Sequence, residues 1–64
     1  MARKFKIIDM NRISKGIREM YTKGKVYKEW SDNFVVVPKG FIILTDDTDK
    51  NFWYMKRDNL KEIK

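Results

Sequence analysis

The stretch FVVVPKGFIILTDDTDKNFWYM, residues 34–55, contains most of the strong β-forming residues of this 64-residue chain. Aromatic and β-branched side chains are stiff about χ1 and fit a pleated sheet, so its three apolar runs are predicted to be short strands. Pro38 and Gly40 supply turn chemistry after the first run, and the polar residues 46–51 form a second turn. The stretch therefore predicts a β-meander. Its strands are expected at residues 34–37, 41–44 and 52–55.

The flanking segments predict further strands. Residues 3–9 alternate apolar and lysine side chains, which is typical of a strand with one buried face. Residues 25–30 predict another strand, whose mixed faces indicate a bulge or an open edge. The polar residues 56–59 are expected to form a single 3₁₀ turn before a short closing strand or tail at 60–63.

Residues 11–21 have two interpretations. Apolar side chains from Ile13 to Tyr21 recur at i, i+4, i+7 and i+8, the spacing of an amphipathic helix. Gly16 in the middle of this segment disfavours a helix by about 1 kcal/mol relative to alanine. We favour the alternative, a long loop with one helical turn.

Length and composition limit what the chain can be. Sixty-four residues without cysteine predict one small domain, residues 1–64, with no disulfide. A chain of this size buries only about 60% of its unfolded surface, so its aromatic side chains are expected to supply much of the core. The sequence has no 18-residue apolar run, and no apolar signal-peptide core follows the basic N-terminus. We expect a cytoplasmic protein that does not enter a membrane.

The residue inventory argues against catalysis. Histidine and cysteine are absent, and the three glycines are too far apart for a phosphate-binding loop. Asp46, Asp47 and Asp49 lie in a turn that we expect to be solvated, where carboxyl pKa values stay ordinary. Residues 47–51 begin like a calcium-binding loop, but Phe52 stands where that loop needs glycine. We predict no enzyme activity, no cofactor and no metal site.

Positive charge is concentrated in the first half of the chain. The net charge is +6, and residues 1–28 hold nine basic and two acidic side chains. A basic half favours a phosphate-bearing partner such as nucleic acid, on whose bases aromatic rings can stack; the alternative is a set of lysines that only keep the protein soluble. The candidate nucleic-acid-binding residues are Lys4, Lys6, Arg12, Lys15, Arg18, Lys23, Lys25, Lys28, Tyr27 and Trp30.

Large rings are also needed to fill so small a core. Phe34, Phe41 and Phe52 are predicted to be core residues. Trp53 and Tyr54 are adjacent on a strand and point to opposite faces, which makes them candidate protein-interface residues. Apolar side chains on both faces of the meander need a cover. This cover is expected to be either the loop 10–24 or a second copy of the chain in a homodimer.

The layout GKVY, FIILTDD, WY and LKEI, read in chain order, resembles the SH3-like small barrels found among short phage proteins. The resemblance covers most of residues 3–63. It implies a mainly β fold of five or six short antiparallel strands, closed into a barrel, with a long basic loop and a 3₁₀ turn near the C-terminus. Because that loop, residues 10–24, is basic and has Tyr21 as its only aromatic residue, it does not predict a groove for proline-rich peptides.

These features lead to alternative functions. The first is a non-enzymatic module that binds nucleic acid or another phosphate-bearing anion through residues 3–28. The second is a phage-type interaction module that binds and inhibits a host protein through exposed apolar sheet surface, with lysines steering it toward an acidic partner. A third is a structural subunit of a larger particle.

Overall fold

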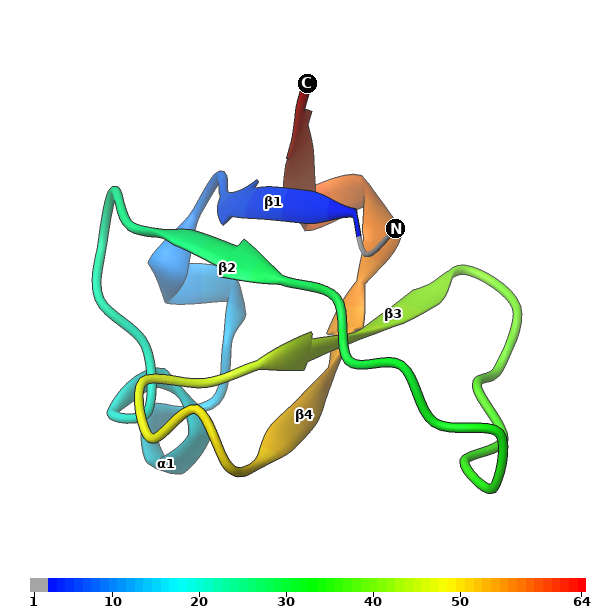
Figure 1. The fold of residues 1–64 in the computed structure, drawn as a ribbon. Helices are drawn as coiled ribbons and strands as arrows, with labels where there is room; N and C mark the ends of the chain where they lie inside the picture. The colour runs from blue at the N-terminus through cyan, green and yellow to red at the C-terminus, as the bar shows by residue number, and fades with distance from the viewer. Residues whose placement is uncertain (1–2) are drawn as a thin grey trace.

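The structure is a computed structural model that describes residues 3–64, and it is mainly β (Figure 1). Its five strands are β1 (Lys4–Ile7), β2 (Val26–Lys28), β3 (Phe41–Thr45), β4 (Phe52–Lys56) and β5 (Leu60–Ile63). They form two antiparallel sheets, one in the order β2-β1-β5 and one made of β3 and β4. A bridge between Glu29 and Leu44 joins the sheets, so that β3 follows β2 in space.

The segment between β1 and β2 holds only short helical turns. Asp9 begins the first of them by accepting a hydrogen bond from the Asn11 backbone N–H at 2.9 Å. The turns are η1 (Met10–Arg12) and α1 (Lys15–Arg18), so the prediction of a loop is confirmed, although the loop contains a 3₁₀ turn in addition to the one α-helical turn. The predicted 3₁₀ turn before the last strand is η2 (Arg57–Asn59).

The predicted strand at residues 34–37 is wrong. These residues form an exposed loop, in which Phe34 is 95% exposed and Val36 is 84% exposed. A strand must pair with a neighbour, and part of each edge of β3 is already paired. Strand β4 pairs along one edge, and the Trp30 N–H donates to the Ile43 carbonyl oxygen at 2.9 Å on the other. The Phe34 N–H instead donates to the Asp32 side-chain oxygen at 2.8 Å, so the apolar run begins in a turn, and Phe34 is not a core residue.

The core lies between the two sheets. Phe5 of β1 and Leu44 of β3 are fully buried in it. The loop between β1 and β2 packs four apolar side chains into or against this core, at the spacing that the sequence indicated. They are Ile13, Ile17, Met20 and Tyr21. The apolar periodicity therefore predicted correctly which side chains turn inward, although only four residues of the loop form an α-helix.

The other face of the β3-β4 sheet is covered by the chain that follows β2. Ile43 on this face is 4% exposed, although it lies outside the core cluster. Trp30 packs on Phe52 with ring centroids 5.0 Å apart. The Tyr54 hydroxyl donates to the Val36 carbonyl oxygen at 2.9 Å. The cover expected from the loop between β1 and β2 is therefore supplied instead by the segment between β2 and β3.

A buried carboxylate organises the turn between β3 and β4. Asp46 is 3% exposed, and it accepts hydrogen bonds from the Thr48 N–H at 2.9 Å and from Trp53 Nε1 at 3.0 Å. Burial raises the pKa of Asp46, but the hydrogen bonds from Thr48 and Trp53 outweigh it and bring this pKa below its ordinary value. The expectation of a solvated turn with ordinary pKa values is therefore wrong for Asp46.

Asp47 ties the same turn to β2. It accepts a hydrogen bond from the Tyr27 hydroxyl at 2.7 Å and forms an ion pair with Lys25 at 3.1 Å. The Tyr27 hydrogen bond is the largest cause that lowers the pKa of Asp47; burial opposes it, and Lys25 lowers the pKa further. The expectation of an ordinary pKa is wrong here too, because no local pattern indicated that Tyr27 would reach this turn.

We expect the free energy of unfolding to decrease as the pH falls below about 4. A carboxyl whose folded pKa lies below its ordinary value of 3.8 stabilises the fold fully above that value, and the stabilisation is lost as pH falls through the folded pKa. Urea unfolding at pH 7 and at successively lower pH values measures the change. The double variant Asp46→Asn, Asp47→Asn cannot titrate at these positions and should show a flatter pH profile. An unchanged profile would contradict this role.

Candidate anion-binding surface

The outer face of the β2-β1-β5 sheet carries a group of exposed lysines. In β1, Phe5 and Ile7 point into the core, and Lys4 and Lys6 point to the outer face, which confirms the predicted alternation. The same alternation holds in β2, where the central Tyr27 is buried between two exposed residues. The sheet therefore has an apolar inner face and a cationic outer face.

The strand register places these lysines opposite one another. Lys4 pairs with Lys28 of β2, and Lys6 pairs with Lys61 of β5. Directly opposite residues in antiparallel strands have Cβ atoms about 4.5–5.5 Å apart, and residues i and i+2 lie about 7 Å apart along a strand. These four residues form a compact cationic patch, which we call the lysine face.

Two aliphatic residues complete the rows across this sheet. Ile63 lies opposite Lys4, and Val26 lies opposite Lys6. The ion pairs found within residues 3–64 use other cations, so none of them neutralises the lysine face. They are Arg3–Glu29, Arg12–Asp58, Lys25–Asp47 and Arg57–Glu62.

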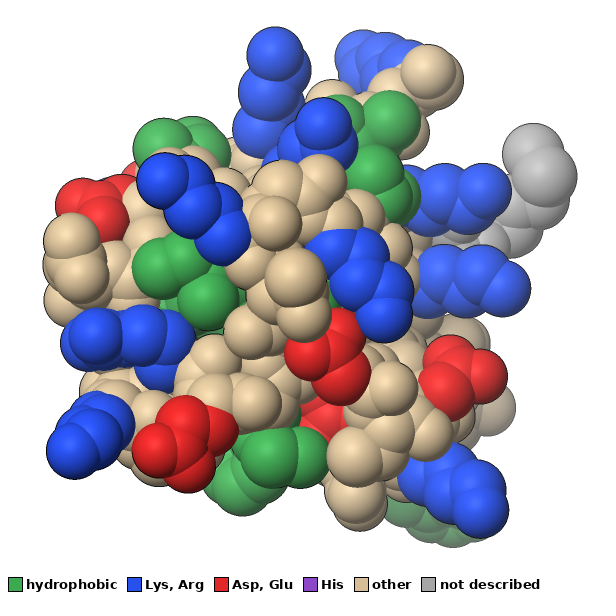
Figure 2. Space-filling model, turned by 90° about the vertical axis from the view of Figure 1, so that its left-hand side faces the viewer, with side chains coloured by type: hydrophobic (Ala, Val, Ile, Leu, Met, Phe, Trp, Pro, Cys, Tyr) green, Lys and Arg blue, Asp and Glu red, His purple; other side chains and the backbone are tan. Residues whose placement is uncertain are grey.

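The space-filling view shows the same concentration of charge. Figure 2 is turned about the vertical axis, so its upper part is the end of the molecule that carries β1, β2 and β5 in Figure 1. Lys and Arg side chains crowd this upper part, with hydrophobic side chains among them, whereas most of the Asp and Glu side chains in this view lie lower. Like charges placed directly opposite destabilise a sheet, so this arrangement lowers folding stability unless an anion covers it.

The other predicted cations lie outside the lysine face. Arg12 and Lys25 form ion pairs with carboxylates, and Arg18 donates to a backbone carbonyl oxygen at 2.9 Å. Lys15 lies in α1, at the opposite end of the molecule from β1 (Figure 1), and Lys23 lies in the turn before β2. Of the eight predicted cations, the structure therefore brings together Lys4, Lys6 and Lys28.

The predicted aromatic candidates do not extend the lysine face. Tyr27 is a core residue, and Trp30 packs on Phe52 with its Nε1 buried and without a hydrogen-bond partner among the described residues. Trp53 packs against the core, whereas Tyr54 is 42% exposed on the opposite face of β4, as strand alternation predicts. Tyr27, Trp30 and Trp53 are therefore engaged in packing within the described chain and are not free to stack on a base.

Sequence reasoning missed Lys61. It lies near the end of the chain, in a half that is not basic overall, and nothing beside it in the sequence marks it as part of a cationic site. The alternation of β5 is readable, because the buried Leu60 precedes the exposed Lys61. The pairing of β5 with β1 is a long-range contact, and it is this contact that sets Lys61 opposite Lys6.

Comparison with known proteins adds no further assignment. The chain matches no protein-family model, no curated protein and no solved structure. In the part of the chain that the structure describes, no group of three or more acidic side chains is placed to hold a metal ion. None of the helices within residues 3–64 is long and apolar enough to cross a membrane.

Proposed function

We propose that the protein is a non-enzymatic binding module whose lysine face holds nucleic acid or another phosphate-bearing polyanion. The observation that carries this proposal is the register that sets Lys4 opposite Lys28 and Lys6 opposite Lys61. Opposed lysines that take part in none of the ion pairs found within residues 3–64 repel one another. A chain of phosphates removes this repulsion and releases its own counterions when it binds.

The composition of the face supports recognition by charge and shape. Lysine is a flexible point charge that suits phosphate oxygens, whereas arginine, asparagine and glutamine read base edges through paired hydrogen bonds of fixed geometry. The lysine face contains none of these, and the rings of Tyr27 and Trp30 are packed elsewhere. The proposed binding is therefore independent of sequence, with contacts to the phosphate backbone only.

The salt dependence of binding to a fluorescent DNA duplex tests the proposal. If the four lysines each neutralise one phosphate, the logarithm of the association constant should fall with the logarithm of salt concentration with a slope of about −3 to −4. Two duplexes of unrelated sequence should give the same slope and the same affinity. Absence of binding at low salt, or a strong preference for one sequence, would overturn the proposal.

We also propose that the fold is an SH3-like barrel. The spatial order β5-β1-β2-β3-β4, the long loop between β1 and β2 and the 3₁₀ turn η2 between β4 and β5 support it. The Arg57 N–H donates to the Gly40 carbonyl oxygen at 2.8 Å, which links η2 to the start of β3 and helps to close the structure. An experimental structure with another strand order would contradict this assignment.

A second candidate function is protein binding through the segment between β2 and β3. Phe34 and Val36 are almost fully exposed on this segment, and exposed large apolar residues that cluster commonly mark interaction sites. A host protein or a second copy of the chain could be the partner. Sedimentation at high concentration tests the homodimer, and a pull-down with wild type and with Phe34→Ser tests the host protein. Retention of the same protein by both would remove this candidate.

A further inference from the structure

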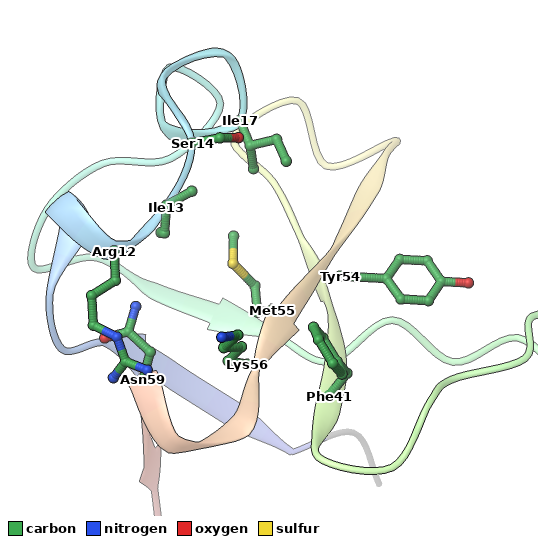
Figure 3. A pocket seen from close by; sticks show the side chains of 9 residues that line it. All are labelled: Arg12, Ile13, Ser14, Ile17, Phe41, Tyr54, Met55, Lys56 and Asn59. Carbon is green, nitrogen blue, oxygen red and sulfur yellow. The ribbon is translucent and has the colours of Figure 1, made fainter.

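A second surface, separate from the lysine face, has a pocket of about 200 Å³ between the loop after β1 and strand β4 (Figure 3). Ile13 and Ile17 of the loop face Met55 of β4 across it, Phe41 also lines it, and the Tyr54 ring points away from it on the other side of β4. Pockets that hold drug-sized molecules and cofactors measure about 300–1,000 Å³. This one is therefore of a size for a single apolar side chain.

The rim of the pocket is polar and carries positive charge. Arg12, Ser14, Lys56 and Asn59 line it, and no acidic residue is among the lining residues. Arg12 is ion-paired with Asp58, whose carboxylate oxygen lies 2.8 Å from its guanidinium. Lys56 is exposed, and the ion pairs formed within residues 3–64 do not include it. Lys56 therefore supplies the uncompensated charge of this rim.

The positive charge continues beyond the pocket. A neighbouring hollow shares Phe41 and Lys56 with it and is also lined by the cations Lys39 and Arg57 and by one carboxylate, Asp58, which is ion-paired with Arg12. Arg57 forms an ion pair with Glu62 at 3.7 Å. Lys39 is exposed and takes part in none of the ion pairs of the described chain. An apolar depression is thus flanked by two uncompensated lysines on one side.

We propose that this pocket binds an acidic peptide segment of a partner protein, anchored by one leucine or phenylalanine side chain. The anchor would pack against Ile13, Ile17 and Met55, and carboxylates beside it would pair with Lys56 and Lys39. The apolar floor excludes a phosphate, and the cationic rim selects against a basic peptide. The proposal does not rest on nucleic-acid binding, because the two surfaces share no residue.

Two-dimensional NMR of the full isotope-labelled chain, titrated with the hexapeptide EDLFED, tests the proposal. Saturable shifts are expected at Ile13, Ile17 and Met55, with a dissociation constant on the order of 0.1–1 mM for so small a contact. The peptides EDSSED, which lacks the anchor, and KKLFKK, which reverses the charge, should each bind at least tenfold more weakly. Equal binding of KKLFKK, or no saturable shift at about 5 mM EDLFED, would overturn it.

Matched charge variants separate the two surfaces. Lys56→Glu should weaken EDLFED binding about tenfold, and Lys61→Glu, which makes the same change on the lysine face, should leave it unchanged. Lys56→Met keeps the length of the side chain without its charge and serves if Lys56→Glu does not fold. The reverse result, in which Lys61→Glu alone abolishes peptide binding, would assign the peptide to the lysine face and refute the pocket.

Discussion

Phe5→Ala is expected to remove most of the stability of this protein. Phe5 is fully buried in β1, the central strand of the three-stranded sheet, and it contacts the core cluster formed by both sheets. Replacing a buried phenylalanine by alanine costs about 3–5 kcal/mol, because the lost contacts and the residual cavity add. A domain of this length has a free energy of unfolding of about 3–10 kcal/mol.

The Phe5 ring also makes cation–π interactions with two arginine side chains. The guanidinium carbons of Arg57 and Arg3 lie 5.1 Å and 5.5 Å from its centroid. A cation over an aromatic face contributes about 0.5–1 kcal/mol at an exposed site, and the truncation removes this contribution as well. Phe5→Ala therefore removes the cation–π interactions with Arg57 and Arg3 in addition to the apolar packing of the core.

Thermal and urea unfolding followed by circular dichroism measure the effect. The melting temperature should fall by about 15 °C or more, because 1 kcal/mol corresponds to about 4–8 °C in a domain of 60–100 residues. Phe34→Ala is the matched control, since the same atoms are removed from a side chain that is 95% exposed. Its effect should stay within about 0.5 kcal/mol. A large loss in Phe34→Ala would show that residues 34–37 pack in the core after all.

The double variant Lys28→Glu, Lys61→Glu is expected to bind a DNA duplex at least about 100-fold more weakly than wild type. Each substitution removes one phosphate contact and places a negative charge in the site, and a contact worth about 1.4 kcal/mol corresponds to a tenfold change in affinity. The salt dependence should also become shallower, by roughly one unit of slope for each lysine lost.

The same double variant should be more stable than wild type. Glutamate at position 28 faces Lys4, and glutamate at position 61 faces Lys6, so two opposed like-charge pairs become opposite-charge pairs. Each favourable cross-strand pair contributes about 0.2–1 kcal/mol. A gain in melting temperature together with a loss of affinity is the expected signature of residues kept for binding at the cost of folding stability.

Charge must be matched in the control, because the double variant lowers the net charge by four. The variant Lys23→Glu, Lys50→Glu makes the same change in turns outside the sheet face. Its affinity should fall only by the modest factor that the overall charge accounts for, and its melting temperature should not rise. Equal loss of affinity in the two double variants would show that binding depends on net charge alone, and the lysine face would not be a site.

The sequence predicted much of the local structure because the relevant forces act between near neighbours. The run FIILT and the run FWYMK are joined by a short polar turn, and they form the β3-β4 hairpin as predicted. The alternation in residues 3–9 predicted which side of β1 is buried. The polar residues 56–59 predicted the turn η2.

The candidate site was predictable in part, for the same reason. Lys4, Lys6 and Lys28 were identified from charge and alternation, and all of them lie on the lysine face. Lys61 was not identified, and the other predicted cations are paired or lie elsewhere, because their positions depend on contacts between distant parts of the chain. The sequence predicted Tyr27 as a surface residue that binds nucleic acid, yet its hydroxyl donates to Asp47, twenty positions away.

The sequence by itself determined where strands can form and which side of each strand is apolar, since both depend on residues one or two positions apart. Only the tertiary structure decided which strands pair. The run at residues 34–37 has high β-propensity but pairs with no strand, and its first N–H donates to the Asp32 side chain in a turn. The lysine face exists because β1 lies between β2 and β5. This arrangement sets Lys28 and Lys61, from distant parts of the chain, directly opposite Lys4 and Lys6.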